Sequence, residues 1–444
     1  MGKWAKAALG CLMTLVAAPG SAELLIQNWQ TKSGARVYFV ENHDLPMLDL
    51  SVEFPAGSGY DKPEQAGLAN LTQHLLKLGA EGLSEDEIAR RLADVGAQLE
   101  GRFDKDRAGL TLRTLVSERE LEQALDTFSR VLQSPQFPEA VLAREKNRIV
   151  AALKESETKP DAIAEKNFYS LLYPDHPYGL RSSGEVKTVS DLQRADLQRF
   201  YQEHYLGSEA VVALMGDVSR AQAQAIAERL TAKLPRLTAT PKVLPKVNDP
   251  AQARNERIEH PASQSHILLG FPGLTRGDPD YFPLYVGNYV LGGGGFVSRL
   301  TEEVRQKRGL AYSVYSYFLP LERPGPFQIG LQTKKEQAQD ALKVVREVVK
   351  EFVARGPHED ELKAAKQNLV LGFPLRIDSN KEILEYLAVI GFYRLPLTYI
   401  DDFPKKVEKV TAAEIRDAFS RRIHLERFVT VVVGAEESAK AEAK

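Results

Sequence analysis

The polar residues with the clearest potential for chemistry stand together in the segment Gly67–Gly79, GLANLTQHLLKLG. Its apolar residues predict a helix, and Asn70, Gln73 and His74 fall on one face of that helix. A neutral imidazole binds metal ions, but the amide of Gln73 cannot take a proton from water at neutral pH. By residue type alone, this face is a polar surface lining a cavity, with His74 as a hydrogen-bonded or exposed helix histidine.

No second histidine is spaced to complete a metal site with His74. None of the eight histidines has another four residues away, the spacing that puts two imidazoles on one helix face. They are His43, His74, His176, His204, His260, His266, His358 and His424. A zinc site with one protein ligand would be weak. We therefore expect no metal bound by this chain, while a site assembled from distant residues remains the open alternative.

A second candidate region, Leu300–Val314, reads LTEEVRQKRGLAYSV and places Arg305 and Tyr312 seven residues apart. Taken alone, Arg305 is a charge on a solvated helix face and Tyr312 is an aromatic residue of a strand. Four consecutive glycines precede the region: Gly292, Gly293, Gly294 and Gly295. They lack the Lys-Ser/Thr of a P-loop, which excludes a phosphate cradle and predicts a flexible turn.

The order of these segments resembles the insulinase/pitrilysin family of zinc peptidases, which includes the mitochondrial processing peptidases. Members carry His-x-x-Glu-His on the first helix. The resemblance implies that Asn70 stands at the first zinc ligand, Gln73 at the general base and His74 at the second ligand. The third ligand, a glutamate after an Arg-Glu-Lys stretch, aligns with Ala151, or with Ala152 after a shift of one residue. The resemblance therefore implies a degenerate zinc site.

The same resemblance gives Arg305 and Tyr312 a role in catalysis. Family members use an Arg and a Tyr at these positions to bind and polarise the substrate near the zinc. A guanidinium can hold a carbonyl or carboxylate, and a phenol can donate to a developing oxyanion. Arg308 is the alternative to Arg305 for this role. The glycine run Gly292–Gly295 corresponds to a loop that often faces the substrate chamber in the family.

The elements that must position these residues occur twice in the chain. Leu48–Phe54 alternates apolar and polar residues as a half-buried strand does, and His266–Phe271 has the same place in the second half. Each half then continues through helices and strands in the same order. Each ends with an apolar strand closing on Gly216 or Gly434, which are 218 residues apart. A repeat of this length indicates duplicated domains, since solenoid units span about 20–50 residues.

We therefore predict an α+β fold of two homologous domains, each an α/β sandwich with helices packed on a mixed, mostly antiparallel sheet. The predicted domains are residues 23–232 and 256–444. Residues 233–255, rich in Pro, Lys, Thr and Ala, form an extended linker between them. The family resemblance implies that two such domains make one half of a clam-shell.

The composition of the chain excludes some classes of protein, and its N-terminal residues predict where it is located. The 444 residues are 43% apolar and 27% charged, which excludes a multi-span membrane protein. The net charge of −2 gives no excess of positive charge with which to bind nucleic acid. The single cysteine, Cys11, excludes an intramolecular disulfide. Residues 1–22 have the three parts of a cleaved signal peptide and no stable membrane span, which predicts a periplasmic protein. A lipid-attachment role for Cys11 is the alternative.

These inferences favour a pseudo-peptidase. The leading hypothesis is a non-catalytic subunit of a periplasmic zinc peptidase, in a heterodimer with a homologous His-x-x-Glu-His subunit that holds the zinc. Arg305 and Tyr312 would act in that partner's site, on a peptide added to an exposed strand edge, Leu48–Phe54 or His266–Phe271. One alternative is a scaffold or peptide-binding, chaperone-like protein with no role in proteolysis. Another is an active peptidase with a relocated metal site.

Overall fold

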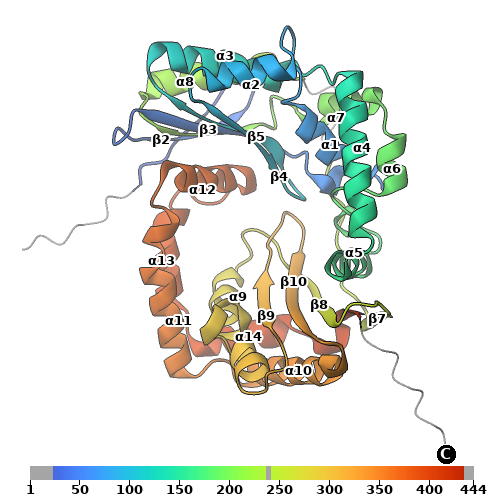
Figure 1. The fold of residues 1–444 in the computed structure, drawn as a ribbon. Helices are drawn as coiled ribbons and strands as arrows, with labels where there is room; N and C mark the ends of the chain where they lie inside the picture. The colour runs from blue at the N-terminus through green and yellow to red at the C-terminus, as the bar shows by residue number, and fades with distance from the viewer. Residues whose placement is uncertain (1–23, 237–241, 435–444) are drawn as a thin grey trace, which may run out of the picture.

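The computed structural model describes residues 24–236 and 242–434 as two α/β layers that face each other (Figure 1). The predicted signal peptide, residues 1–22 with Cys11, lies outside the described residues. Within the described ranges, none of the helices combines the length and the apolar character needed to traverse a bilayer.

Six strands form the N-terminal sheet in the order β1-β2-β6-β3-β5-β4. β2 and β6 run parallel, and the other neighbouring pairs are antiparallel. The strands are β1 Gln27–Gln30, β2 Arg36–Glu41, β3 Met47–Phe54, β4 Gln98–Phe103, β5 Ala108–Leu115 and β6 Val211–Gly216.

Five strands form the C-terminal sheet in the order β7-β11-β8-β10-β9. β7 and β11 run parallel, and the other pairs are antiparallel, so this sheet repeats the pattern β2-β6-β3-β5-β4 strand for strand. The strands are β7 Arg254–Ile258, β8 Gln264–Leu274, β9 Ser313–Phe318, β10 Gly325–Lys334 and β11 Val429–Val433. The predicted duplication and the α+β fold with mixed, mostly antiparallel sheets are confirmed.

The predicted exposed edges are wrong. β3 contains the predicted strand Leu48–Phe54 and lies between β6 and β5, while β8 contains His266–Phe271 and lies between β11 and β10. Both are interior strands with neighbours on each side. In the described residues the sheet edges are β1 and β4 in one half and β7 and β9 in the other. Alternation along a strand shows which face is buried but contains no information about how many neighbours the strand has.

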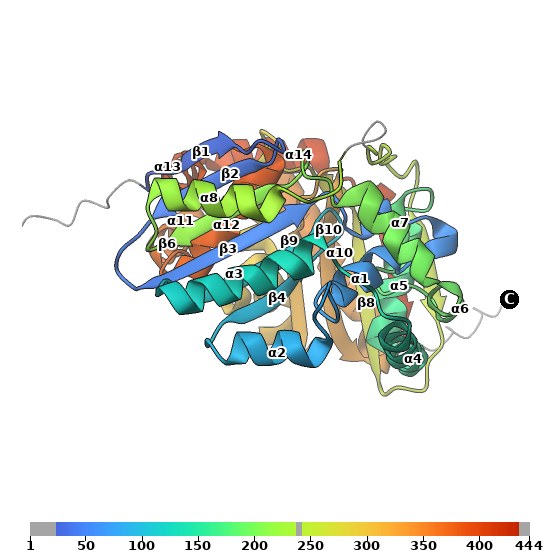
Figure 2. The same ribbon diagram turned by 90° about the horizontal axis from the view of Figure 1, so that it is seen from above.

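The helices of the first half begin with α1 Leu68–Leu75, α2 Glu85–Ala93, α3 Glu118–Gln133 and α4 Glu139–Ser156. They continue with α5 Pro160–Leu172, α6 Val186–Asp191, α7 Arg194–His204 and α8 Arg220–Thr231. α2, α3 and α8 cover the outer face of the N-terminal sheet (Figure 2). The apolar residues of β3, at positions 48, 50, 52 and 54, pack into the core beneath these helices. The capping box predicted at Ser84 and Glu87 is confirmed at the start of α2.

The helices of the second half are α9 Tyr281–Asn288, α10 Ala338–Arg355, α11 Glu359–Leu371, α12 Asn380–Tyr393, α13 Tyr399–Lys409 and α14 Ala412–Arg422. α10 packs on β8 and β10, and α14 packs against α9 and α10, which places them on the outer face of the second sheet (Figure 1).

The two halves exchange one helix each. α5 packs on β8 and β11 of the C-terminal sheet, and α12 packs on β3 and β6 of the N-terminal sheet. α12 comes so close that a Cβ at Gly391 would lie 2.6 Å from side-chain atoms of Tyr38 and Val211. Each sheet therefore has its inner face covered by a helix from the other half, and neither half buries both faces of its sheet alone.

The turn between β4 and β5 joins the two halves through a buried carboxylate. Asp106 accepts hydrogen bonds from the hydroxyl of Tyr178, from the hydroxyl of Tyr393 at 2.8 Å and from the backbone N–H of Glu322 at 2.7 Å. Tyr393 ends α12, and Glu322 precedes β10, so two of the three donors come from the C-terminal half. Asp106 is fully buried, and burial raises the pKa of its carboxyl.

Arg107, the next residue, is the centre of a buried ion pair. Its guanidinium lies 2.9 Å from Glu53 on β3 and 2.8 Å from Asp104, and its side chain and that of Glu53 are only 5% and 3% exposed. The guanidinium also faces the rings of Phe392 and Tyr393 at 5.7 and 5.6 Å. The charge is therefore satisfied by both the sheet and the exchanged helix α12.

We expect Arg107→Met to lower the free energy of unfolding by about 3–5 kcal/mol, because it leaves the carboxylate of Glu53 buried without a partner. The double variant Glu53→Gln/Arg107→Met is expected to lose less, since it leaves no buried charge at this pair. Guanidinium denaturation followed by circular dichroism measures both. The matched control is Arg355→Met, which removes an exposed pair with Glu351 and is expected to change little. Equal losses for Arg107→Met and Arg355→Met would contradict this account.

The segment between the halves is held to the body through His176. Residues 242–253 contain no helix or strand. His176, which is 7% exposed, lies with Nε2 3.1 Å from the carbonyl of Pro245 in this segment, and its Nδ1 accepts the N–H of Tyr178 at 3.0 Å. Burial lowers the pKa of His176 to about 4. Protonation would also place a proton on Nδ1, where the N–H of Tyr178 already points.

We expect acid to weaken the fold through His176. Its folded pKa of about 4 is below the unfolded value of about 6.5. The contribution of His176 to the free energy of unfolding is therefore fully present above pH ~6.5 and is lost as pH falls towards ~4. Allowing for partial screening by solvent, the loss is on the order of 2 kcal/mol. Urea denaturation of wild type and His176→Gln between those pH values measures it. A slope identical in both proteins would contradict the assignment.

Candidate functional site

The helix α1 carries the degenerate motif and is fixed at its N-terminus by a buried carboxylate. Asp61 accepts the backbone N–H of Gly67 at 2.9 Å and of Ala69 at 2.8 Å. Leu68, Leu71 and Leu75 face the core. Burial raises the pKa of Asp61 to about 7, against the opposing effect of the two N–H donors. The polar face of α1 is thus held in place independently of any metal.

Gln73, at the position of the general base, is hydrogen-bonded to the N-terminal sheet. It is buried, and its Nε2 donates to the carbonyl of Gly109 on β5 at 3.1 Å. It also lies against Gly101 on β4, where an added Cβ would come within 2.2 Å of Nε2. A carboxylate in the same pose would face the carbonyl oxygen of Gly109 and repel it. The site is therefore adapted to an amide, which donates a hydrogen bond and takes no proton.

His74, at the second ligand position, is paired with a carboxylate instead of a metal. Its Nε2 lies 3.1 Å from Glu145 on α4, and Glu145 is also 2.8 Å from Arg144. Burial opposes ionisation of Glu145, but hydrogen bonds from Arg144 and His74 outweigh it and lower the pKa of its carboxyl. The Arg-Glu-Lys stretch is visible in the sequence, but its glutamate is recognisable as the partner of His74 only in the folded chain, because that contact depends on how α1 packs on α4.

The first and third zinc-ligand positions, Asn70 and Ala151, carry side chains that zinc does not favour. Ala151 is exposed on α4, and Asn70 is partly exposed and lines a cavity of about 330 Å³. An amide, one imidazole and a methyl group do not form a zinc ligand set. In the part of the chain that the structure describes, no group of three or more His, Cys, Asp or Glu side chains could hold a metal ion. The residues of this chain do not fit zinc.

The second group of predicted residues lies in the other half, and the structure brings Arg305 and Tyr312 together. Arg305 is on a π-helical segment, η6 Thr301–Gln306, and Tyr312 directly precedes β9. The guanidinium carbon of Arg305 is 5.6 Å from the ring centroid of Tyr312 and 5.0 Å from that of Phe296. The sequence analysis missed Phe296, which follows the glycine run and is 69% exposed.

The geometry distinguishes Arg305 from its alternative, Arg308. Arg308 donates to the carbonyl of Glu303 at 2.7 Å and forms an ion pair with the Glu303 carboxylate. Arg305 has no carboxylate within ion-pair distance among the described residues and stacks between two rings. Tyr312 is 74% exposed. Arg305 and Tyr312 therefore present an unneutralised charge and a phenol to the solvent.

The glycine run has a packing explanation for part of its length. A Cβ at Gly292 would lie 2.3 Å from the Oγ of Ser316 and 2.7 Å from Leu300. Gly292 lies within the π-helical segment η4 Tyr289–Gly293, which continues α9. Gly295 has φ of +62°, with no atoms within 4 Å of an added Cβ. Close packing thus explains Gly292, and a left-handed turn that exposes Phe296 explains Gly295.

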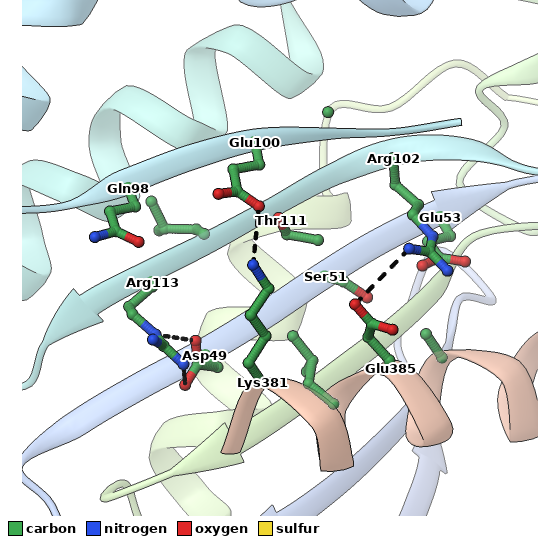
Figure 3. A pocket seen from close by; sticks show the side chains of 14 residues that line it. Asp49, Ser51, Glu53, Gln98, Glu100, Arg102, Thr111, Arg113, Lys381 and Glu385 are labelled. Atoms are coloured by element: carbon green, nitrogen blue, oxygen red, sulfur yellow. Dashed lines mark hydrogen bonds and ion pairs between the residues drawn. The ribbon is translucent and has the colours of Figure 1, made fainter. Parts of the chain in front are cut away.

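A polar layer between the N-terminal sheet and α12 was not predicted (Figure 3). Asp49 pairs with Arg113 at 2.7 Å, while Lys381 and Glu385 on α12 lie 3.3 and 3.8 Å from Glu100 and Arg102 on β4. The cavity there is about 80 Å³. The pairs made by Lys381 and Glu385 join the sheet to the exchanged helix.

The duplicated sandwich with a remnant of a helix-borne zinc motif defines a two-domain protein of the zinc-peptidase fold. Comparison with family models assigns residues 36–184 to "Insulinase (Peptidase family M16)" and residues 191–369 to "Peptidase M16 inactive domain". The chain is similar to the crystal structure of a peptidase M16 inactive domain from Pseudomonas fluorescens, with 37% identity and a TM-score of 0.90 over 94% of this chain and 100% of that chain. The chain belongs to the insulinase family, peptidase family M16.

Two relatives carry different descriptions. A protein of Helicobacter pylori called "Non-peptidase homolog YmxG" is 27% identical over 409 residues, which are 91% of this chain and 93% of that protein. A protein of Bacillus subtilis called "Uncharacterized zinc protease YmxG" is 26% identical over 355 residues, 80% of this chain and 85% of that protein. The predicted membership of the family, with a degenerate motif, is confirmed. Together with the residues on α1, these matches are consistent with a non-catalytic homologue.

We expect the wild-type chain to take up no stoichiometric zinc, and Asn70→His/Gln73→Glu/Ala151→Glu to take it up if α1 and α4 keep the family geometry. The substitutions restore two ligands and the base beside His74. Metal analysis after dialysis against zinc measures uptake. The matched control adds His74→Ala to the triple variant and is expected to bind no more than wild type. Absence of zinc in the folded triple variant would show that Ala151 is not the ligand position or that the site has drifted.

Proposed function

We propose that this chain is the non-catalytic subunit of a periplasmic zinc peptidase and pairs with a homologous His-x-x-Glu-His subunit. The observation that supports this most directly is the contrast between its two groups of family residues. On α1 the ligand set is lost, with Gln73 bonded to the sheet and His74 to Glu145. In the other half, the half-buried Arg305 lies beside the exposed Tyr312 and has no carboxylate within ion-pair distance in residues 24–236 and 242–434. The zinc of the assembly belongs to the partner subunit.

In this proposal the residues of this chain bind and orient a substrate and perform no proton transfer from water. The guanidinium of Arg305 holds a carbonyl or carboxylate of the peptide, with its orientation limited by Phe296 and Tyr312. The phenol of Tyr312 donates a hydrogen bond to oxygen that becomes negative during attack. β9 is an edge strand that starts directly after Tyr312, and an extended peptide would add to its open side near Tyr312. Farther along β9 the carbonyl of Ser316 already accepts a hydrogen bond from Asn288.

The periplasmic location in this proposal depends on residues 1–22. Their basic start, apolar middle and small residues before Ala22 have the pattern of a cleaved signal peptide. A chain without cysteine after cleavage agrees with a compartment in which disulfides are not required for this fold.

The alternative proposal is a scaffold or peptide-binding protein with no role in proteolysis. The description of the Helicobacter relative as a non-peptidase homolog favours it. The exposed apolar residues Phe296 and Val297 beside the glycine run also suit a docking surface better than a site that only polarises a bond. The two proposals differ in what Arg305 and Tyr312 contribute to activity.

The first experiment isolates the tagged mature chain from its native cells and identifies co-purifying proteins by mass spectrometry. We expect a stoichiometric partner of similar size that contains His-x-x-Glu-His. Recovery of the chain alone, or with unrelated envelope proteins, would move the proposal to the scaffold.

In the purified assembly, we expect Tyr312→Phe to lower kcat/KM by about 100-fold, because it removes one donor to the developing oxyanion. Arg305→Ala is expected to have a similar or larger effect through lost binding. Hydrolysis of a fluorogenic peptide mixture measures both. The control is Arg308→Ala, whose guanidinium is already neutralised by Glu303 and which is expected to leave the rate unchanged. Unchanged activity in an Arg305→Ala/Tyr312→Phe assembly would contradict a catalytic contribution and favour the scaffold.

A further inference from the structure

A separate cavity opens beside Asn70, in the half that lost the zinc ligands. Its volume is about 330 Å³, larger than a few waters require. Four segments form its walls: α1, the turn after β4, one side of α5 and the stretch 179–183, which begins at the last residue of η3 Pro177–Gly179. Its polar lining includes Asn70, Lys105, Glu165, Lys166, Arg181 and Ser183. The cavity is distinct from the Arg305 and Tyr312 pair, which is on the other half.

The cavity is lined by three cations, of which Lys166 is neutralised by a carboxylate and Arg181 is hydrogen-bonded to a hydroxyl. Lys166 forms an ion pair with Glu185 at 2.7 Å, and Arg181 donates to the hydroxyl of Ser156 at 2.6 Å. Lys105 has no carboxylate within ion-pair distance in the described residues. Its ammonium makes one long contact, 3.4 Å to the carbonyl of Leu180, and lies 4.8 Å from the centroid of the Tyr169 ring.

Lys105 is therefore a poorly satisfied cation. An ammonium has three donors, and a cation–π contact with one long hydrogen bond leaves donor capacity unused. Burial lowers the pKa of Lys105 to about 8, so most of it is charged at neutral pH although its surroundings oppose the charge. An anion in the cavity would offset the unfavourable free energy of keeping the buried ammonium of Lys105 charged.

Two neutral donors share the cavity with Lys105. Asn70 and Ser183 both line it, and in the described residues neither the amide of Asn70 nor the hydroxyl of Ser183 has a hydrogen-bond partner. An ammonium with unused donor capacity, together with an amide and a hydroxyl that have no protein partner in the described residues, favours a ligand made of acceptor oxygens. The ring of Tyr169 supplies an apolar wall next to them.

The charge around Lys105 favours a monoanion over a phosphate dianion. Glu165, Asp106 and Asp61 are close enough to stabilise the charged form of Lys105, and they would repel additional negative charge. A carboxylate has one charge and two oxygens that accept from separate donors. The volume leaves room for the organic group that carries it, against Tyr169.

We propose that this cavity binds the carboxylate of an organic ligand, with Lys105 as its charge partner and Asn70 and Ser183 as the neutral donors. The ligand is a peptide with a free C-terminus or a small organic acid, which share this chemistry. The site belongs to this chain alone and does not require the partner subunit of the proposed function. Its test therefore has an outcome independent of whether a paired peptidase exists.

Calorimetric titration of the full mature chain tests the proposal with three probes: N-acetyl-Ala-Ala-Phe, its C-terminal amide and sodium acetate. We expect the free acid to bind at least about tenfold more tightly than the amide, because a charge-assisted hydrogen bond is lost. Binding of acetate as tightly as the peptide acid would assign the site to small organic acids. Stronger binding of the peptide acid would assign it to peptide C-termini.

Lys105→Met is expected to weaken binding of the free acid by at least about tenfold, whereas Lys166→Met, in the same cavity but paired with Glu185, is expected to change it less than about threefold. Equal effects of the two variants would indicate net charge only and would overturn the assignment to Lys105. Equal binding of acid and amide to the wild type, or no binding of any probe in the millimolar range, would overturn the carboxylate site without any variant.

Discussion

The turn between β4 and β5 is the contact on which the rest of the molecule depends. In two consecutive residues it presents a buried carboxylate, Asp106, and a buried guanidinium, Arg107. Asp106 binds the ends of α12 and of the β9–β10 connection, while Arg107 binds β3. A buried charge is tolerable only with its partners in place. Any displacement of one half from the other would therefore leave a charge unsatisfied, and this requirement fixes their relative position.

The exchange of α5 and α12 also fixes the relative position of the two halves, and it does so symmetrically. Both helices have equivalent places in the duplicated halves, and each covers the inner face of the other sheet. The inner face of the N-terminal sheet is polar, with Asp49, Ser51 and Glu53 on β3. Ion pairs of Lys381 and Glu385 with β4, as well as apolar contact, hold α12 there. A metal is not needed for this arrangement. Loss of zinc ligands on α1 consequently leaves the scaffold intact, with His74 bonded to Glu145 and Gln73 to the sheet.

The two groups of functional residues lie in different halves of the molecule. α1 and the cavity beside it offer the donors Asn70, Lys105 and Ser183. The π-helical segment before β9 holds the half-buried Arg305 beside the exposed Tyr312. π-helical turns interrupt regular helices and are frequent at functional sites, because the extra residue redirects side chains. Both regions are suited to hold a ligand.

The sequence by itself determined the local structure, the duplication and the loss of the motif. Alternation in Leu48–Phe54 predicted a strand, and Ser84 with Glu87 predicted a helix start, because these signals depend on neighbours within a few residues. The changed residues at Asn70, Gln73 and Ala151 were visible at once. Only the tertiary structure decided that β3 is interior, that Arg305 and not Arg308 is unpaired, and that Glu145 partners His74.

Lys105 was invisible in the sequence for the same reason. Its cavity is formed by α1, the β4–β5 turn, α5 and residues 179–183, which are far apart in the chain. Periodicity records which face of an element is buried, but not which distant element covers it. Charge satisfaction is a property of three-dimensional neighbours, so one lysine among many differs from the others only after the chain has folded.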